Sequence, residues 1–224
     1  MRQAYNEQLH TLHRELRDMA NLCEQAVSLA VQSVTKRETA LVDQVRGVDA
    51  LIDKKERDIE SLCLKLLLQQ QPVASDLRDI SSALKMISDL ERIGDQASDI
   101  AEISRFTSQV EGDDSFDDLR QMAAETVKMV TESVDAFERH DLVLARDVIR
   151  YDSVVDRWFD RIKTDLVDAI SKDNSRGEYY LDLLMVAKYL ERIGDHATNV
   201  AEWVEYSIIG RRSKDGVMPE EGQE

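Results

Sequence analysis

Cysteine, proline and glycine are scarce in this sequence, with two cysteines, two prolines and eight glycines among 224 residues. Cys23 and Cys63 both lie among leucines in helical patterns, which excludes a disulfide framework and fits a reducing compartment. Proline is the residue that most strongly breaks helices, and it occurs only as Pro72 and Pro219. The composition therefore favours long, uninterrupted helices.

Positive charge is also in short supply, since 29 lysines and arginines stand against 45 aspartates and glutamates, a net charge of −16. A chain this acidic is not expected to attract nucleic acid or an anionic membrane surface through its overall charge. It favours cations or basic partners instead. The longest apolar run, Leu62 to Leu68, contains Lys65 and is far shorter than the roughly 18 residues of a membrane helix. No signal-peptide pattern precedes it. We therefore expect a soluble, cytoplasmic protein without membrane insertion.

Apolar residues recur at helical spacing almost throughout the chain, and no alternating strand pattern appears. Ser75 is predicted to cap the start of the third helix, and Gly210 to follow the last one. Helices of about 30 residues joined by short loops pack as antiparallel neighbours, which predicts an all-α protein. The six expected helices span residues 4–34, 38–69, 76–108, 117–138, 142–172 and 179–209.

One motif of thirteen residues occurs twice, 100 residues apart. It reads Leu90-Glu-Arg-Ile-Gly-Asp-Gln-Ala-Ser-Asp-Ile-Ala-Glu102 and then Leu190-Glu-Arg-Ile-Gly-Asp-His-Ala-Thr-Asn-Val-Ala-Glu202, with nine positions identical. Such a repeat indicates a duplicated structural unit. We expect two tandem, sequence-related antiparallel three-helix bundles, residues 1–110 and 111–210, followed by a flexible polar tail, residues 211–224.

Each copy of the motif carries an acidic stripe. On a helix that turns about 100° per residue, its polar members fall within an arc of about 80°, opposite the apolar face. We expect both stripes on the outside of the bundles, because the apolar faces must point inward. Like charges one turn apart repel by a few tenths of a kcal/mol, and a bound cation would relieve this repulsion. The stripes consist of Glu91, Asp95, Asp99 and Glu102, and of Glu191, Asp195, Asn199 and Glu202.

A second acidic pair precedes each motif. Asp49 and Asp53 are four residues apart, and so are Asp152 and Asp156, at an offset of 103. If the paired helices are antiparallel neighbours, at least four carboxylates converge in each copy. Carboxylate oxygens suit Mg, Ca, Mn or ferric iron, with Zn also open. Two solvated acidic faces are the alternative for so charged a chain.

Gly94 and Gly194 lie in mid-helix beside the stripes, where glycine costs about 1 kcal/mol relative to alanine. Close helix packing is one explanation, and room for a bound ion or partner is the other. Glu56 and Glu60 extend the first acidic pair, and the second copy lacks this extension. His196 is expected to point away from the carboxylates.

These motifs resemble those of the PhoU family, the accessory regulators of phosphate-specific transport. The resemblance rests on Asp76-Leu-Arg and on the two Leu-Glu-Arg-Ile-Gly-Asp motifs, and it covers roughly residues 1–210. It implies two three-helix bundles with multinuclear metal clusters on their outer faces, iron in some members and other divalent ions, such as Zn, Mn or Mg, in others. The ligands that it implies here are Asp49, Asp53, Glu91, Asp95 and Asp99 in the first copy, and Asp152, Asp156, Glu191, Asp195 and Asn199 in the second.

The same resemblance implies a regulatory adaptor without catalytic activity. Its expected role is negative control of phosphate uptake and of phosphate-starvation signalling, through contacts with the phosphate transporter's ATPase subunit and a membrane sensor kinase. A homodimer is one candidate assembly. The second site has fewer carboxylates, so its cluster is expected to be smaller or to bind another ion.

Two other functions remain open from the residues, a di-metal carboxylate enzyme and a metal-free structural adaptor. Enzymes of the ferritin type use Glu-x-x-His pairs that face a bundle interior, and the stripes contain none. Replacing Glu91 and Asp95 by their amides distinguishes the hypotheses. A structural adaptor would keep or gain stability, whereas a metal protein would lose metal from one half only.

Overall fold

Six α-helices account for nearly all of residues 2–69, 74–110 and 116–212, the part of the chain that the computed structural model describes. No strand occurs in these ranges, which confirms the all-α prediction. The helices are α1 (Arg2–Thr35), α2 (Ala40–Gln69), α3 (Ala74–Thr107), α4 (Asp117–Arg139), α5 (Leu142–Lys172) and α6 (Gly177–Ile209), with a short 3-10 helix, η1 (Asn174–Arg176), before α6.

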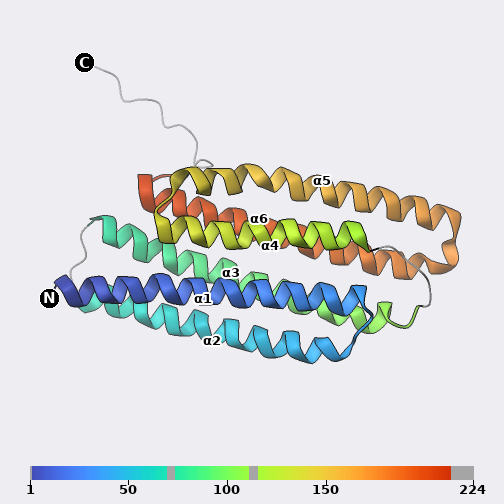
Figure 1. Ribbon diagram of the computed structural model, residues 1–224, viewed down its shortest axis with the longest axis horizontal. Helices are drawn as coiled ribbons and strands as arrows, with labels where there is room; N and C mark the ends of the chain where they lie inside the picture. Colours follow the sequence, from blue (N-terminus) through green and yellow to red (C-terminus); the bar gives the residue numbers. More distant parts are fainter. Residues whose placement is uncertain (1, 70–73, 111–115, 213–224) are drawn as a thin grey trace, which may run out of the picture.

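The helices form two antiparallel groups of three (Figure 1). Helices α1, α2 and α3 all contact one another, and so do α4, α5 and α6. The two groups meet through α3 against α6 and through α1 against α4. Because α3 and α6 carry the repeated motif, the two copies lie directly against each other. None of the described helices is both long and apolar enough to cross a bilayer.

The ends of all six helices agree with the predictions to within two residues, but one predicted helix cap is wrong. Helix α3 begins at Ala74, so Ser75 lies inside its first turn, and the prediction that Ser75 caps this helix is wrong. Asp76 in the same turn places a negative charge where the helix dipole favours one. Gly210 follows α6 as predicted, with φ of 78° and its N–H donating to the Tyr206 carbonyl at 2.8 Å. Most of the predicted tail lies outside the described residues.

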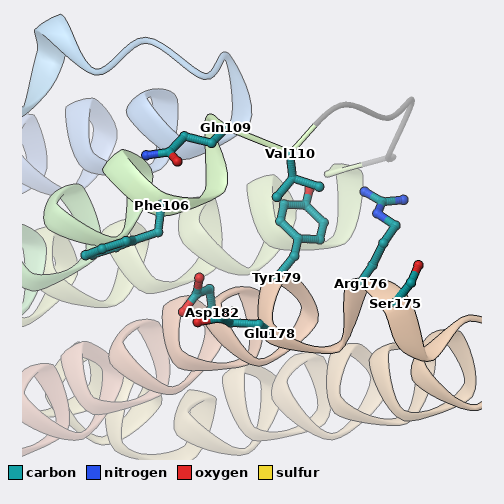
Figure 2. A pocket seen from close by; sticks show the side chains of 8 residues that line it. All are labelled: Phe106, Gln109, Val110, Ser175, Arg176, Glu178, Tyr179 and Asp182. Carbon is teal, nitrogen blue, oxygen red and sulfur yellow. The ribbon is translucent and has the colours of Figure 1, made fainter.

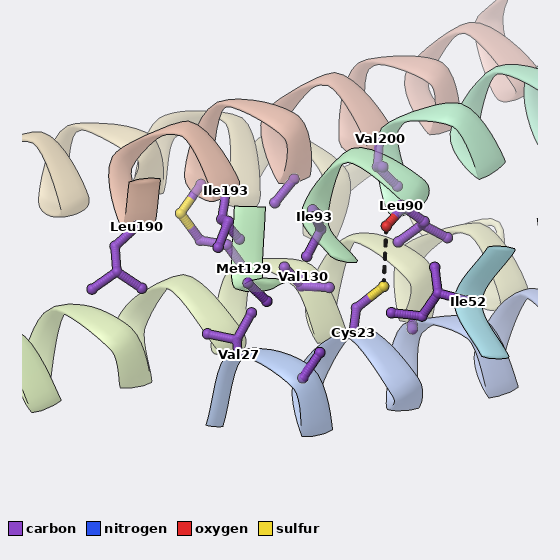
Figure 3. Close-up of a cluster of buried hydrophobic side chains, with 14 of the residues drawn as sticks. Cys23, Val27, Ile52, Leu90, Ile93, Met129, Val130, Leu190, Ile193 and Val200 are labelled. Carbon is purple, nitrogen blue, oxygen red and sulfur yellow. Dashed lines mark hydrogen bonds between the residues drawn. The ribbon is translucent and has the colours of Figure 1, made fainter. Parts of the chain in front are cut away.

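One hydrophobic core runs through both groups of helices. Figure 3 shows where α3 and α6 contribute to it, with Leu90 and Ile93 from one copy of the motif and Leu190 and Ile193 from the other. Burying each such side chain contributes about 1.5–3 kcal/mol. The thiol of Cys23 donates to the Leu90 carbonyl at 3.3 Å, and burial raises the pKa of this thiol. The cysteine is thus a core residue and not a nucleophile.

Candidate functional site

The structure brings the acidic pairs of α2 and α3 together on one side of the first bundle. Their proximity is evident at Asp49, whose pKa is raised first by burial and then by the charges of Asp53, Asp95 and Asp99. Glu56 belongs to the same group, because its charge raises the pKa of Glu91. The first acidic cluster thus consists of Asp49, Asp53 and Glu56 from α2, and of Glu91, Asp95 and Asp99 from α3.

Asp49 lies deepest in the first acidic cluster. Its Oδ2 accepts a hydrogen bond from Ser98 Oγ at 3.0 Å, while its Oδ1 is buried without a hydrogen-bond partner. A Cβ atom placed on Gly94 would lie only 2.8 Å from this Oδ1. The carboxylate therefore occupies the space that the missing side chain leaves, and any side chain at position 94 would have to displace Asp49 and Ile52.

Glu91 and Asp99 of this cluster are also disfavoured as anions. Burial, followed by the charge of Asp95, raises the pKa of Glu91, and the same two causes raise the pKa of Asp99. Arg92 offsets part of this repulsion, with its guanidinium 2.9 Å from Asp95 and 3.5 Å from Glu91. Its side chain is 59% exposed, so solvent screens these ion pairs. The cluster retains an excess of negative charge that a cation would neutralise.

The second acidic cluster repeats this arrangement in the other bundle. It consists of Asp152 and Asp156 from α5, and of Glu191 and Asp195 from α6. Burial comes first among the causes that raise the pKa values of Asp152 and Asp195, and charges within the cluster follow. Lys188 forms an ion pair with Glu191, so a lysine side chain neutralises part of the negative charge of this cluster.

A hydroxyl group positions the central aspartate in both clusters. Thr198 Oγ1 donates to Asp152 Oδ1 at 3.1 Å, as Ser98 does to Asp49. Burial raises the pKa of both aspartates, and the hydroxyls offset part of this rise, since they stabilise the anion. Sequence reasoning did not assign this role, although a hydroxyl side chain at the ninth position of both motif copies was the available signal.

Asn199 makes a contact that its position in the motif did not predict. Its Nδ2 donates to Asp89 Oδ1 on α3 at 3.3 Å, and His196 Nδ1 lies 2.9 Å from the same oxygen. The counterpart Asp99 instead faces Tyr189, whose hydrogen bond lowers the pKa of Asp99. Asn199 thus donates a hydrogen bond to a neighbouring carboxylate, whereas Asp99 accepts one from a neighbouring tyrosine hydroxyl. The difference between the two copies thus follows the asymmetry of the α3–α6 contact.

The acidic stripes are not entirely on the outside of the bundles. Glu202 is only 7% exposed, so the expectation of an open stripe is wrong for this residue. Helix α5 packs over this end of α6, where Arg146 pairs with the buried Glu205 at 2.8 Å. In the first copy, Glu102 takes part in ion pairs with Arg46 and Arg105.

The chemistry of the first acidic cluster fits a bound cation. All its donors are carboxylate oxygens, the ligands that Mg and Mn prefer and that iron and zinc accept, and Asp49 Oδ1 is buried without a hydrogen-bond partner. Within the described ranges, no group of three or more His, Cys, Asp or Glu side chains is already placed to hold a metal ion. Binding would therefore draw the carboxylates closer together.

Two tandem three-helix bundles, each with an acidic cluster between its last two helices, define a class of duplicated helical proteins. A family model described as the PhoU domain matches residues 16–104 and 119–204. The phosphate-specific transport system accessory protein PhoU homologue of Pseudomonas aeruginosa is 37% identical over 209 residues, 93% of this chain and 86% of that protein. The homologue from Clostridium acetobutylicum is 33% identical over 212 residues, 94% of this chain and 97% of that protein. The chain belongs to the PhoU family.

Solved structures agree with this assignment. The crystal structure of PhoU from Pseudomonas aeruginosa matches with a TM-score of 0.86 and 37% identity, over 92% of this chain and 99% of that one. The phosphate transport system regulatory protein PhoU from Streptococcus pneumoniae matches with a TM-score of 0.84 over 93% of this chain and 98% of that one. At 23% identity, the second match supports the fold alone.

Proposed function

We propose that this chain is a metal-binding regulatory adaptor that negatively controls phosphate uptake and phosphate-starvation signalling. The support comes from membership of the family, whose relatives are named as accessory proteins of phosphate-specific transport. The first acidic cluster is the observation that carries the metal-binding part. There, four of the six carboxylates, Asp49, Glu56, Glu91 and Asp99, have raised pKa values, and Asp49 carries a buried oxygen without a hydrogen-bond partner.

The residues that would hold the ions are the predicted carboxylates of each copy. A bound iron or other divalent ion would supply the positive charge that the clusters lack, while Ser98 and Thr198 keep the central aspartates in position. A bound cation would also bridge α2 to α3 and α5 to α6. Binding would therefore reduce the negative charge of each cluster and make each helix pair more rigid. The candidate ligands are Asp49, Asp53, Glu91, Asp95 and Asp99 in the first cluster, and Asp152, Asp156, Glu191, Asp195 and the neighbouring Asn199 in the second.

In this proposal the adaptor acts in the cytoplasm, between the ATPase subunit of a phosphate transporter and a membrane sensor kinase. A role in catalysis is disfavoured by the position of the clusters at the surface between two helices. Glu91 and Asp95 have side chains that are 23% and 38% exposed, whereas di-metal oxidases enclose their ions in a bundle interior. A homodimer is the assembly that we would test first.

Elemental analysis tests the metal-binding part of the proposal. The chain is purified without chelator and loaded with iron, zinc or manganese, as wild type and as the double variants Asp49→Asn/Asp53→Asn and Asp152→Asn/Asp156→Asn. Each variant should lose the metal of one cluster and keep that of the other. A control, Asp58→Asn/Asp147→Asn, removes two exposed carboxylates elsewhere and should keep both. Wild-type protein without metal after all three loadings would reject metal binding.

The adaptor role needs a separate measurement in cells. A strain that lacks its own PhoU protein is complemented with each variant, and a phosphate-starvation reporter is followed in high phosphate. The wild type should repress the reporter, and so should the surface control. Failure of the wild type to repress, with normal expression, would reject phosphate control as the function of this chain.

A further inference from the structure

At one end of the α3–α6 contact, an arginine side chain from α3 covers the last turn of α6. Arg78, near the start of α3, donates from Nε to the Ser207 carbonyl in the last turn of α6 at 3.1 Å. Its Cδ would lie 3.8 Å from a Cβ atom placed on Gly210. The guanidinium thus covers the carbonyl end of α6, where the helix dipole favours a cation.

At the opposite end of the same contact, the two helices exchange roles, and the position equivalent to Arg78 is not an arginine. The start of α6 now meets the end of α3, and the position 100 residues after Arg78 is Glu178. Val110, the counterpart of Gly210, and Glu178 line one cavity of about 290 Å³. Figure 2 shows this recess between the end of α3 and the start of α6. The pseudo-symmetric counterpart of a filled site is therefore an open one.

The recess has an acidic wall and an apolar rim. Glu178 and Asp182 are one helical turn apart in its wall, and burial, followed by the charge of Glu178, raises the pKa of Asp182. Phe106 lines the recess with 64% of its surface exposed. Arg176 also lines it, but its guanidinium lies over the rings of Tyr179 and Tyr180, at 4.8 and 5.2 Å. In the view of Figure 2, Tyr179 separates Arg176 from Asp182.

We propose that this recess receives an arginine side chain from a basic amphipathic segment of a partner protein. The two carboxylates accept the N–H groups of a guanidinium, and the aromatic ring of Phe106 packs against its stem. Leu181 and Met185 are exposed on the same helix as Glu178 and offer apolar contacts to the rest of such a segment. This inference rests on the proposed adaptor role, because it requires a partner protein. It does not require a bound metal ion.

The test uses a defined probe in the presence of chelator, so that failure of metal binding does not affect it. A labelled peptide of about 16 residues, with leucines and arginines at helical spacing, is titrated by fluorescence anisotropy. A matched peptide carries citrulline, which has the same shape without the charge. The arginine peptide should bind, and the double variant Glu178→Gln/Asp182→Asn should weaken binding about tenfold.

Two controls keep the result specific to the recess. The variant Asp58→Asn/Asp147→Asn makes the same change in net charge elsewhere and should weaken binding less than about twofold. Glu178→Arg should abolish binding, because it supplies the arginine that Arg78 provides at the other end. Circular dichroism verifies that each variant is folded. Equal loss in the recess variant and the surface control, or equal binding of the citrulline peptide, would overturn the proposal.

Discussion

Substituting alanine for the two motif glycines should have opposite effects on stability. At Gly94 the new Cβ atom would lie 2.8 Å from Asp49 Oδ1 and 2.9 Å from Ile52 Cδ1. At Gly194 the nearest atom is Val155 Cγ1 at 3.4 Å, which is ordinary contact. The same substitution in the same motif thus makes overly close contacts in one bundle and ordinary van der Waals contacts in the other.

The expected magnitudes follow from two competing terms. Alanine in place of glycine stabilises a helix interior by about 1 kcal/mol. Gly194→Ala should therefore raise the free energy of unfolding by roughly 0.5–1 kcal/mol. At Gly94, overpacking against the fully buried Ile52 costs about 1–3 kcal/mol and cancels or exceeds this gain. The two variants should differ by about 1–3 kcal/mol.

Urea unfolding followed by circular dichroism measures this difference, with chelator present and with the wild type beside both variants. The transition midpoints should rank Gly194→Ala above wild type and Gly94→Ala at or below it, with equal slopes. Equal stabilisation by both substitutions would refute the close approach of Asp49 and Ile52 to α3. A metal titration adds a second check, since displacement of Asp49 should weaken binding to the first cluster only.

Three further predictions concern the acidic clusters and the end of α6. Asp49→Asn should raise the free energy of unfolding of the metal-free protein by about 1 kcal/mol, because it removes a buried repelling charge, and should lower stability once metal is added; thermal unfolding with and without metal measures both signs. Burial raises the pKa values of Asp49 and Glu91 in the folded state, so the folded chain binds protons more tightly than the unfolded one. Metal-free stability should therefore rise as pH falls from 7 through these raised values toward about 4, and a flat or falling profile over that range would contradict this. Arg78→Ala should cost about 1 kcal/mol and speed hydrogen exchange in the last turn of α6, whereas exchange unchanged from wild type would show that the Ser207 carbonyl does not depend on Arg78.

Sequence periodicity was sufficient to predict the helices and to bring together the carboxylates within each bundle. Residues one turn apart share a helix face, so Asp49 and Asp53 had to meet Glu91 and Asp95 once α2 and α3 were antiparallel neighbours. The relevant contacts are local to one bundle. Metal binding itself stays a prediction, because only chemical analysis of the protein can test it.

Contacts between the two bundles could not be predicted in the same way. The hydrogen bond from Asn199 to Asp89 depends on which side of each bundle faces the other. The sequence of each motif helix predicts one wide apolar face. The spacing of its apolar residues does not indicate which of them pack within their own bundle and which pack against the other bundle. Arg78 belongs to the Asp76-Leu-Arg motif, and the equivalent positions of the second copy read Arg176-Gly-Glu178. Its hydrogen bond to the Ser207 carbonyl is visible only in the structure.

The packing of α3 on α6 has a consequence for each half of the chain taken alone. A separate first bundle would present to water the part of α3 that now lies against α6, including the surroundings of Leu90 and Ile93. Since α6 carries nearly the same motif, a second copy of that bundle could cover α3 in its place. The single polypeptide thus resembles a symmetric dimer of three-helix bundles joined into one chain. Because the two bundles need not be identical in sequence, one end of the α3–α6 contact carries Arg78 and the other carries Glu178.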